Sequence, residues 1–210
     1  MQEVAVNGEE LIFHPSGVVY WREQKALLIA DVHLGKISHF RKFGSAVPEK
    51  AILKNFEQLK AVVHEFHPET IYFLGDLFHS SFNQEFQYFK EWVEKQSATI
   101  VLIIGNHDII SPIHFEKLGI KIKEEVFLKK FVLTHHPEER EGFFNICGHI
   151  HPGFRLRGIG KQHEKLRCFY KTEKRLILPA FGTFTGNYMI QPKTEDEVYV
   201  CTASEVIAIP

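Results

Sequence analysis

The sequence is short of cysteine and of long apolar runs, and each shortage excludes a class of protein. Its three cysteines, at positions 147, 168 and 201, form no CxxC pair, so we expect reduced core thiols and neither a disulfide framework nor a zinc knuckle. No apolar run approaches the ~20 residues of a membrane span, and the N-terminus lacks a signal-peptide pattern. We therefore expect a soluble cytoplasmic protein that does not enter a membrane.

Net charge is also nearly absent. The formal net charge of −1 gives no overall attraction for a polyanion, so any attraction for phosphate must be local or carried by bound cations. Charged residues make up 24% and hydrophobic residues 44% of the 210 residues, which is typical of a folded globular chain. The one excess is histidine, with 13 residues, and its meaning depends on where they fall.

Apolar runs alternate with amphipathic segments in the first half of the chain. Buried strands are predicted at 26–30, 70–74 and 99–104, with helices at 48–66 and 82–93 between them. Strands that alternate with helices at these lengths imply right-handed crossovers and a mostly parallel sheet.

The remainder of the chain favours short strands. Turn formers among residues 2–21 indicate one or two β-hairpins before the first buried strand. Further strands are predicted at 130–134, 144–147, 166–171, 174–178, 188–191 and 197–209. These predict a second, more antiparallel sheet. Because no linker or repeat interrupts the chain, we expect one α/β domain over residues 1–210, with two stacked sheets flanked by helices.

Polar side chains that bind metals follow the ends of five predicted strands. The carboxyl ends of parallel strands are where α/β folds gather ligands, so we expect these side chains to converge. A mixture of carboxylate, imidazole and amide, without thiolate, suits Mn, Fe or Zn better than a structural zinc site. The residues are Asp31 and His33, Asp76, Asn106 and His107, His135, and His149 and His151.

The order Asp-x-His, Gly-Asp, Gly-Asn-His-Asp, His and Gly-His-x-His, over residues 31–151, resembles the calcineurin-like metallophosphoesterase superfamily. The resemblance implies a four-layer α/β/β/α sandwich of two mixed sheets and a site for two divalent metal ions, Mn in the first place and Fe or Zn as alternatives. It implies that Asp31, His33 and His151 hold one metal, that Asn106, His135 and His149 hold the other, and that Asp76 bridges both.

The same resemblance implies a phosphodiesterase reaction. Two cations ~3.5–4 Å apart can share a hydroxide, lower its pKa and clamp the ester oxygens during in-line attack on phosphorus. His107 would face the substrate and stabilise the transition state or protonate the leaving oxygen. Asp108 would orient His107 and keep it charged.

A narrower resemblance covers most of the chain. The stretches DVHLGK at 31–36, HFR at 39–41, GDLFHS at 75–80 and LPAFGTFTG at 178–186 are similar to those of the bacterial ligase-associated metallophosphoesterase. This resemblance implies a manganese-dependent single-strand DNA endonuclease that works in DNA repair, in association with a DNA ligase and a helicase.

Several residues near these motifs have two interpretations. Lys36, His39, Arg41 and His79 are candidates for substrate binding, and a solvated loop or a structural role is the alternative. His136 is an alternative ligand to its neighbour His135. Residues 181–186 either line the pocket or form a tight connection between strands. Basic residues at 155, 157, 161 and 165 could extend a basic rim, although such charge runs are usually just solvated surface.

Two other functions fit the same fold. A phosphodiesterase or pyrophosphatase that acts on a small nucleotide would need the same metal ligands, and the near-zero net charge suits it equally well. A non-catalytic binding module could dispense with the catalytic imidazole, so the presence of both His107 and Asp108 argues against it.

Overall fold

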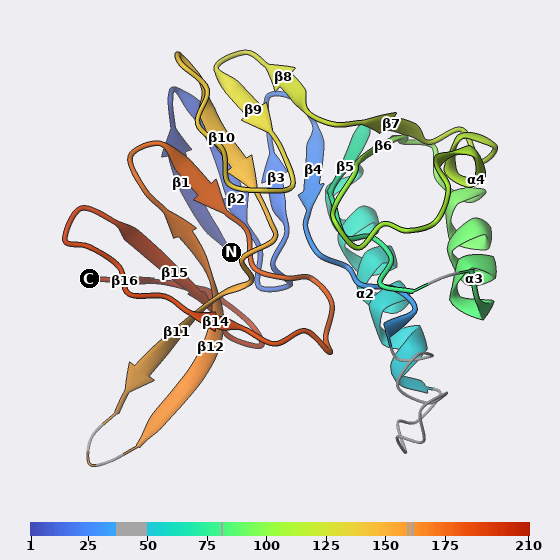
Figure 1. The fold of residues 1–210 in the computed structure, drawn as a ribbon. Coiled ribbons are helices and arrows are strands. Elements are labelled where there is room, and N and C mark those ends of the chain that lie inside the picture. Colours follow the sequence, from blue (N-terminus) through green and yellow to red (C-terminus); the bar gives the residue numbers. More distant parts are fainter. Residues whose placement is uncertain (37–49, 81, 159, 161) are drawn as a thin grey trace.

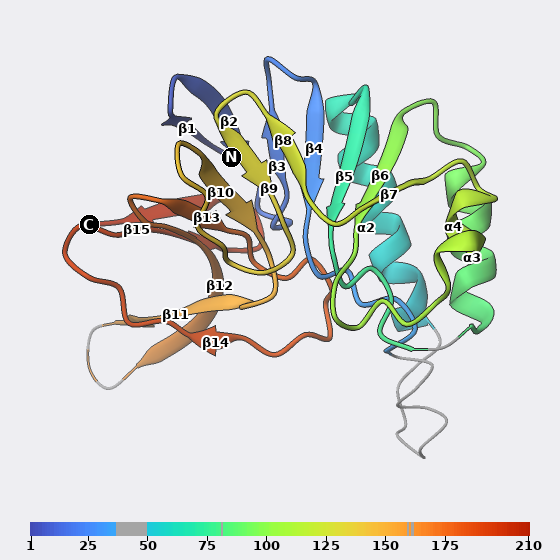
Figure 2. The ribbon, with the colours of Figure 1, turned by 45° about the horizontal axis from the view of Figure 1, so that its top comes forward.

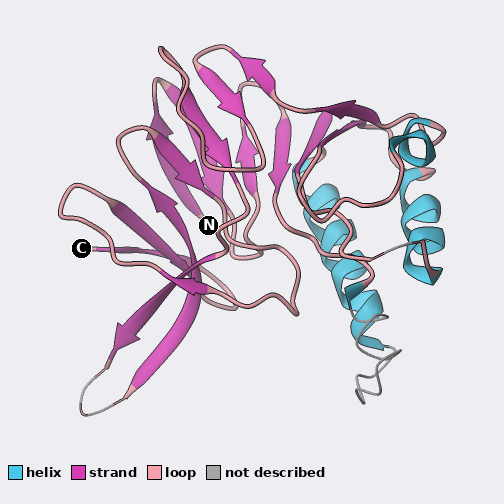
Figure 3. Cartoon of the chain, in the orientation of Figure 1, coloured by secondary structure: helices cyan, strands magenta, loops and turns pink. Residues whose placement is uncertain are grey.

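The computed structural model describes residues 1–36, 50–80, 82–158, 160 and 162–210. Two β-sheets lie face to face, and the described helices gather on the outer side of one of them (Figure 1). The same layering is seen when the ribbon is tilted (Figure 2) and when it is coloured by secondary structure (Figure 3). The predicted α/β class with two mixed sheets is confirmed.

The first sheet has seven strands in sequence order. The first four strands pair antiparallel, and the last four pair parallel, as the strand–helix alternation predicted. Its strands are β1 (Gln2–Val6), β2 (Glu9–Phe13), β3 (Val19–Trp21), β4 (Ala26–Ile29), β5 (Thr70–Leu74), β6 (Thr99–Ile103) and β7 (Lys121–Lys123).

Three described helices cover this sheet: α2 (Lys50–Phe66), α3 (Gln84–Val93) and α4 (Pro112–Glu116). Alternation along β4 directs Leu27 and Ile29 toward the helices and Leu28 toward the second sheet. Helix α3 begins two residues later than predicted, because the Asn83 side chain accepts the backbone N–H of Glu85 and caps the first turn.

The second sheet has nine strands with mixed pairing. The strand predicted at 197–209 is two strands, because a turn at Thr202–Glu205 reverses the chain. The strands are β8 (Val126–Leu128), β9 (Phe131–Leu133), β10 (Phe144–Cys147), β11 (Pro152–Arg157), β12 (His163–Lys171), β13 (Arg175–Ile177), β14 (Tyr188–Met189), β15 (Glu197–Cys201) and β16 (Val206–Ile209).

The main core lies between the two sheets and fixes how they face each other. Leu74 and Ile103 from the first sheet pack with Phe131 and Phe169 from the second. The ring of Phe169 stacks on that of Phe13 with centroids 4.4 Å apart. All three cysteines are free and buried, as predicted.

The four-layer sandwich implied by the resemblance also has helices on the outer face of the second sheet. In the part of the chain that the structure describes, helices cover only the first sheet (Figure 3). The second sheet has a small apolar cluster of its own, around Cys168, Val198 and Val200, with Phe154 and Ile209 packed against it. Among the described helices, none combines the length and apolar character needed to span a bilayer.

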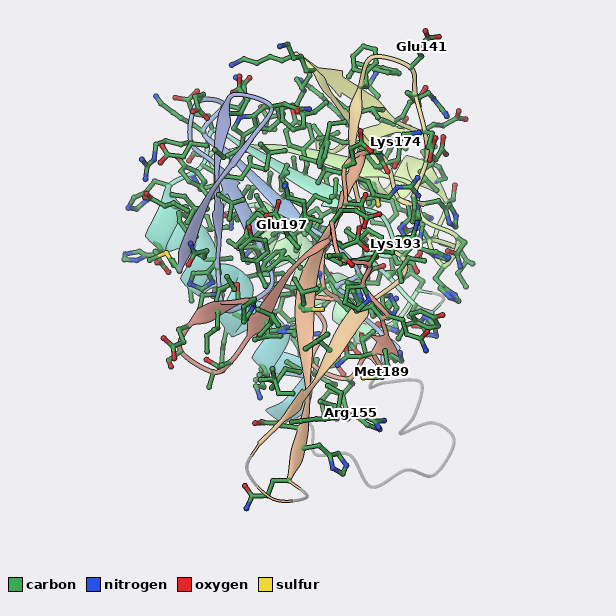
Figure 4. The ribbon with its side chains drawn as sticks, turned by 90° about the vertical axis from the view of Figure 1, so that its left-hand side faces the viewer. Glu141, Arg155, Lys174, Met189, Lys193 and Glu197 are labelled. Atoms are coloured by element: carbon green, nitrogen blue, oxygen red, sulfur yellow. The ribbon has the colours of Figure 1, made fainter. Side chains whose placement is uncertain are left out.

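One part of the second sheet projects from the body. Between residues 154–157 and 163–166, strands β11 and β12 pair with each other in register. Their neighbours, β14 and β15, pair only at the base, at Pro152–Gly153 and at Cys168–Lys171. We call these two stretches the β11–β12 arm, which extends below the rest of the chain in Figures 1 and 4.

Candidate metal centre

The predicted metal-binding side chains converge where the two sheets meet. Those from the first sheet follow the carboxyl ends of β4, β5 and β6, and those from the second follow β9 and β10. A hydrogen bond joins the two groups directly: the backbone N–H of His149 donates to Asp31 Oδ2 over 2.9 Å. The first sheet supplies Asp31, His33, Asp76 and Asn106, and the second supplies His135, His149 and His151.

A first cluster is formed by Asp31, His33 and His151, whose ligand atoms lie within 4.8 Å of one another. Asp31 Oδ1 and His151 Nε2 are 3.3 Å apart, yet both are buried atoms without a hydrogen-bond partner. Buried polar atoms normally have partners, and leaving them unpaired is costly. A cation between these two atoms would satisfy both, so the cluster fits a metal ion.

A second cluster surrounds His135, which is almost fully buried. Its Nδ1 lies 2.9 Å from the carbonyl oxygen of Leu74, which can only accept, so Nδ1 carries the proton. In a ring that carries this one proton, the lone pair is on Nε2. That atom faces Asn106 Oδ1 at 2.9 Å, His149 Nδ1 at 3.2 Å and Asp76 Oδ1 at 3.3 Å. Such a convergence of acceptor atoms also fits a cation.

Asp76 lies between the two clusters. Its Oδ2 is 3.4 Å from His33 Nε2 in the first cluster, and its Oδ1 is 3.3 Å from His135 Nε2 in the second. Burial would raise the pKa of Asp76, but the hydrogen bond with His33 and the nearby imidazole of His135 outweigh it and hold the pKa well below its usual range. The carboxylate thus stays charged, with one oxygen directed to each cluster.

The backbone at this centre is strained. Non-glycine residues rarely adopt positive φ, and such conformations cost about 1–3 kcal/mol each and concentrate at functional sites. Five of the predicted ligands do so at once, which marks the centre as a place where function outweighs local stability. They are Asp31 (φ 54°), His33 (φ 52°), Asp76 (φ 51°), His149 (φ 70°) and His151 (φ 52°).

Two motif glycines allow the ligands of neighbouring strands to come close. A Cβ on Gly105 would lie 2.2 Å from Asp76 Oδ1, and a Cβ on Gly148 would lie 2.6 Å from Asp31 Oδ2. Any side chain at either position would push a ligand carboxylate away. The glycines of the Gly-Asn-His-Asp and Gly-His-x-His motifs are therefore required by packing against the centre.

Residues 181–186, which had two interpretations, lie along the centre. The backbone N–H of Gly182 donates to the carbonyl of Asp31 over 3.1 Å, and Thr185 Oγ1 lies 2.9 Å from His33 Nδ1. Phe184 is 41% exposed and lines a small pocket that also includes His33 and Lys36. Thr185 belongs to this candidate stretch, but sequence reasoning did not single it out, because its partner lies 152 residues away.

Three of the residues predicted to face the substrate lie among the described residues: His107, His79 and Lys36. The exposed ring of His107 is tilted against that of His79, with centroids 4.3 Å apart, and its centroid lies 6.1 Å from that of His33. Burial and the neighbouring histidines lower the pKa of His79 to about 4. Lys36 is partly buried beside His33, and burial lowers its pKa. His39 and Arg41 lie outside the described residues.

Asp108 has partners other than the one predicted. Its two carboxylate oxygens accept the backbone N–H groups of Phe78, over 3.0 Å, and of Gly105, over 2.9 Å. Burial raises the pKa of Asp108 to about 6. The prediction that Asp108 orients the His107 ring is corrected accordingly: this carboxylate ties the loop after β5 to the loop after β6, on which Asp76 and Asn106 lie.

His136 belongs beside the second cluster. Its ligand atom, with those of His135 and His149, forms a further group within 4.8 Å. Its ring is 4.1 Å from that of His149. His135 is buried and directed at Asp76, whereas His136 is exposed, so His135 remains the better ligand of the two.

Comparison with known proteins agrees with this geometry. The model of a family described as calcineurin-like phosphoesterase matches residues 25–186, a range that holds every residue of the two clusters. The chain belongs to the calcineurin-like phosphoesterase family. Among solved structures it is similar to the crystal structure of Pseudomonas putida nuclease MPE, with 28% sequence identity, 99% of each chain covered and a TM-score of 0.81. None of the curated proteins compared with the chain matches it.

The predicted superfamily is thereby confirmed, and the chain is a hydrolase of phosphoesters. The family uses divalent metals, and the two clusters of this chain are groups that could bind them. The electrostatics of this phosphoesterase suit a site that binds cations. Asp31 and Asp76 are buried carboxylates that would repel a phosphate ester. Cations at the two clusters would reverse the sign of the local charge and attract the substrate, although the chain as a whole is nearly neutral.

Proposed function

We propose that the chain is a two-metal phosphodiesterase that cleaves nucleic acid, with single-stranded DNA as its substrate. The observation that carries the proposal is the position of Asp76, which directs one carboxylate oxygen to a histidine of each cluster. The likeness to a nuclease over 99% of both chains supports nucleic acid as the substrate class.

We assign the metal ligands by cluster. The first cation would be held by the group around Asp31, where two buried ligand atoms lack partners, and the second by the group around His135. Oxygen and imidazole ligands accept Mn, Fe and Zn, and Mn is our first choice. The assignment is Asp31, His33 and His151 for the first metal, Asn106, His135 and His149 for the second, and Asp76 for both.

The chain's own groups then have distinct tasks. When bound, the two cations would activate water and neutralise the phosphate oxygens. The His107 ring is exposed beside the clusters while its backbone N–H is held by Asp76 Oδ1 over 2.9 Å, so the ring is free to protonate the leaving oxygen or to stabilise charge on the phosphate. Lys36 and His79 lie on the same side and would contact the flanking phosphate.

A substrate panel tests the proposal. The Mn-loaded protein should cleave single-stranded oligonucleotides as well as the small diester bis-p-nitrophenyl phosphate. A control loaded with excess chelator should cleave neither. Hydrolysis of the small diester with DNA left intact would reject the nuclease activity and favour a small nucleotide substrate. Parallel incubations with Fe and Zn would identify the preferred metal, and RNA and circular DNA would define the polymer and the mode of cutting.

His107→Ala tests the role of the exposed imidazole. We expect the variant to bind two metal ions, because the His107 side chain is not a ligand in either cluster. Its turnover should fall by ~10²–10⁴-fold, the usual contribution of a positioned acid–base group. Unchanged turnover would reject the catalytic role, and loss of metal with turnover would show that His107 acts as a ligand.

A role in DNA repair is the part of the proposal that rests on the ligase-associated resemblance alone. If it is right, cells that lack the protein should be more sensitive to DNA-damaging agents than cells that carry it. Association with a DNA ligase and a helicase belongs to the same proposal, and co-purification with either enzyme from the native cell tests it. Equal survival of both cell lines would count against the repair role.

A further inference from the structure

The two faces of the β11–β12 arm differ in character. Side chains alternate along each strand, so every second residue shares a face. On one face Phe154, Leu156 and Leu166 pack against the small apolar cluster of the second sheet. On the other face Arg155 and Arg157 of β11 lie opposite Lys165 and His163 of β12, and the three Arg and Lys residues are exposed.

One cross-strand pair on this second face joins two side chains of the same charge. Arg155 lies directly opposite Lys165, and like charges placed opposite each other destabilise a pair of strands. Farther along β12 a cation has an opposite charge across from it: Lys171 lies opposite Glu197 on β15 and forms an ion pair with it. Within the described part of the chain, no ion pair with a carboxylate involves Arg155, Arg157 or Lys165. An anion from outside the chain would relieve the repulsion.

This basic face leads away from the metal centre. Strand β11 begins at Pro152, directly after the proposed ligand His151. At ~3.3–3.4 Å per residue, Arg155 lies roughly 13 Å and Arg157 roughly 20 Å along the strand from His151. Figure 4 shows Arg155 on the projecting arm, away from the body of the protein.

The base of the same face contacts the wall of the metal centre. Arg167 pairs with Gly153 and so shares the face of Arg155 and Lys165. Its guanidinium donates to the carbonyl oxygens of Ala180 and Phe181, over 3.1 and 3.5 Å. The next residue, Gly182, hydrogen-bonds to Asp31. Hydrogen bonds therefore connect the base of the basic face to the segment that contacts the metal centre.

We propose that the basic face of the β11–β12 arm binds the sugar–phosphate backbone of a nucleic-acid strand whose scissile phosphate lies at the metal centre. The inference rests on the proposed nuclease function and adds a second contact region to it. A polyanion supplies the charge that the cross-strand cations lack, and a strand that passes from the centre along the arm would meet Arg155 and then Arg157. A small diester would reach the centre without touching the arm.

The test compares two triple variants with the same change of net charge. Arg155→Ala/Arg157→Ala/Lys165→Ala removes the cations of the arm. The control removes cations that form exposed ion pairs elsewhere, which contribute little to stability. It is Arg22→Ala/Lys25→Ala/Lys174→Ala.

Three measurements are made on each protein. Affinity for a labelled single-stranded oligonucleotide is followed by fluorescence anisotropy over a range of salt, with Mn-loaded proteins that all carry His107→Ala so that cleavage is slow. Cleavage of the same oligonucleotide and of bis-p-nitrophenyl phosphate is followed with Mn-loaded protein. We expect the arm variant to bind at least 10-fold more weakly, and its salt slope to fall by about 2, since each phosphate contact on a single strand contributes ~0.7. Its turnover of the small diester should match that of the wild type and of the control.

Two outcomes would overturn the proposal: an arm variant that binds with the wild-type affinity and salt slope, or one that loses small-diester turnover to the same extent as DNA cleavage.

A further variant, Arg155→Lys/Arg157→Lys, keeps the charges of the arm and should retain binding. If it binds as weakly as the alanine variant, the loss of affinity comes from the fold of the arm and not from its charge, and the proposal is overturned. Failure of the wild type to cleave DNA would refute the nuclease function separately, because binding is measured separately from cleavage.

Discussion

Gly105 offers the sharpest test of how the metal centre is packed. A Cβ added there would lie 2.2 Å from Asp76 Oδ1 and 2.3 Å from the backbone nitrogen of Asp76. Ordinary contact between heavy atoms begins at about 3.5 Å, so Gly105→Ala must separate the two loops by roughly 1 Å. Because one of the obstacles is backbone, a change of rotamer at Asp76 does not relieve the clash.

The expected effect is moderate on stability and large on activity. Overpacking of this kind costs about 1–3 kcal/mol, which lowers the Tm of a chain of this size by roughly 2–12 °C. A displacement of roughly 1 Å in the carboxylate shared by both clusters should lower turnover by about 10²-fold. The loss of activity should thus greatly exceed what the remaining folded fraction would explain.

The assay measures thermal unfolding, bound metal and turnover of bis-p-nitrophenyl phosphate for Gly105→Ala and a matched control. Gly186→Ala makes the same chemical change near the same centre, but its added Cβ would have no heavy atom within 4 Å. We expect the control to behave like the wild type. If Gly105→Ala also retains two metal ions and wild-type turnover, the reasoning about close approach is refuted.

Three further predictions concern the surroundings of the centre. Thr185→Val removes the hydrogen bond to His33 Nδ1 without changing the shape, and we expect about 10–100-fold weaker metal binding by calorimetry, with Thr185→Ser near the wild type. Mn at ~100 times its Kd should stabilise the protein by about 2.7 kcal/mol and raise Tm by roughly 5–11 °C. Asp31→Asn should lose most of that rise, and an equal rise in both proteins would contradict the ligand assignment. Phe184→Ala removes an exposed ring beside His33 and should weaken oligonucleotide binding by about 1–3 kcal/mol while sparing turnover of the small diester. Equal losses on both substrates would instead indicate that the ring supports its loop.

The buried strands and the ligands that follow them could be predicted from local sequence. The runs at 70–74 and 144–147 are mainly apolar, and the structure places strands at the same residues. Strands β7 and β8 have three residues each, too few for a periodic pattern to be seen. Their pairing depends on neighbours distant in sequence.

Contacts made across the fold were beyond local reasoning. The carboxylate of Asp108 binds the backbone of Phe78, 30 residues away, so the neighbouring His107 was a reasonable but wrong partner to choose. The left-handed conformation of Asp31 and His149 is likewise set by tertiary structure, because Asp and His adopt it more often than most residues but only in a minority of cases. Sequence indicated which residues gather at the centre, whereas the fold determined what holds them there.

The meeting of both sheets at the metal centre has a consequence for how the protein comes apart. Asp31 and His149 are 118 residues apart in the chain, and the cation site around Asp31 includes His151. A covalent cross-link that closes a loop of about 100 residues stabilises a protein by ~4.7 kcal/mol in the chain-entropy model. All three cysteines of this chain are free, so none provides such a link. The cation would instead act as a removable cross-link between the two sheets. A chelator would remove this cross-link, whereas a reductant would leave it in place.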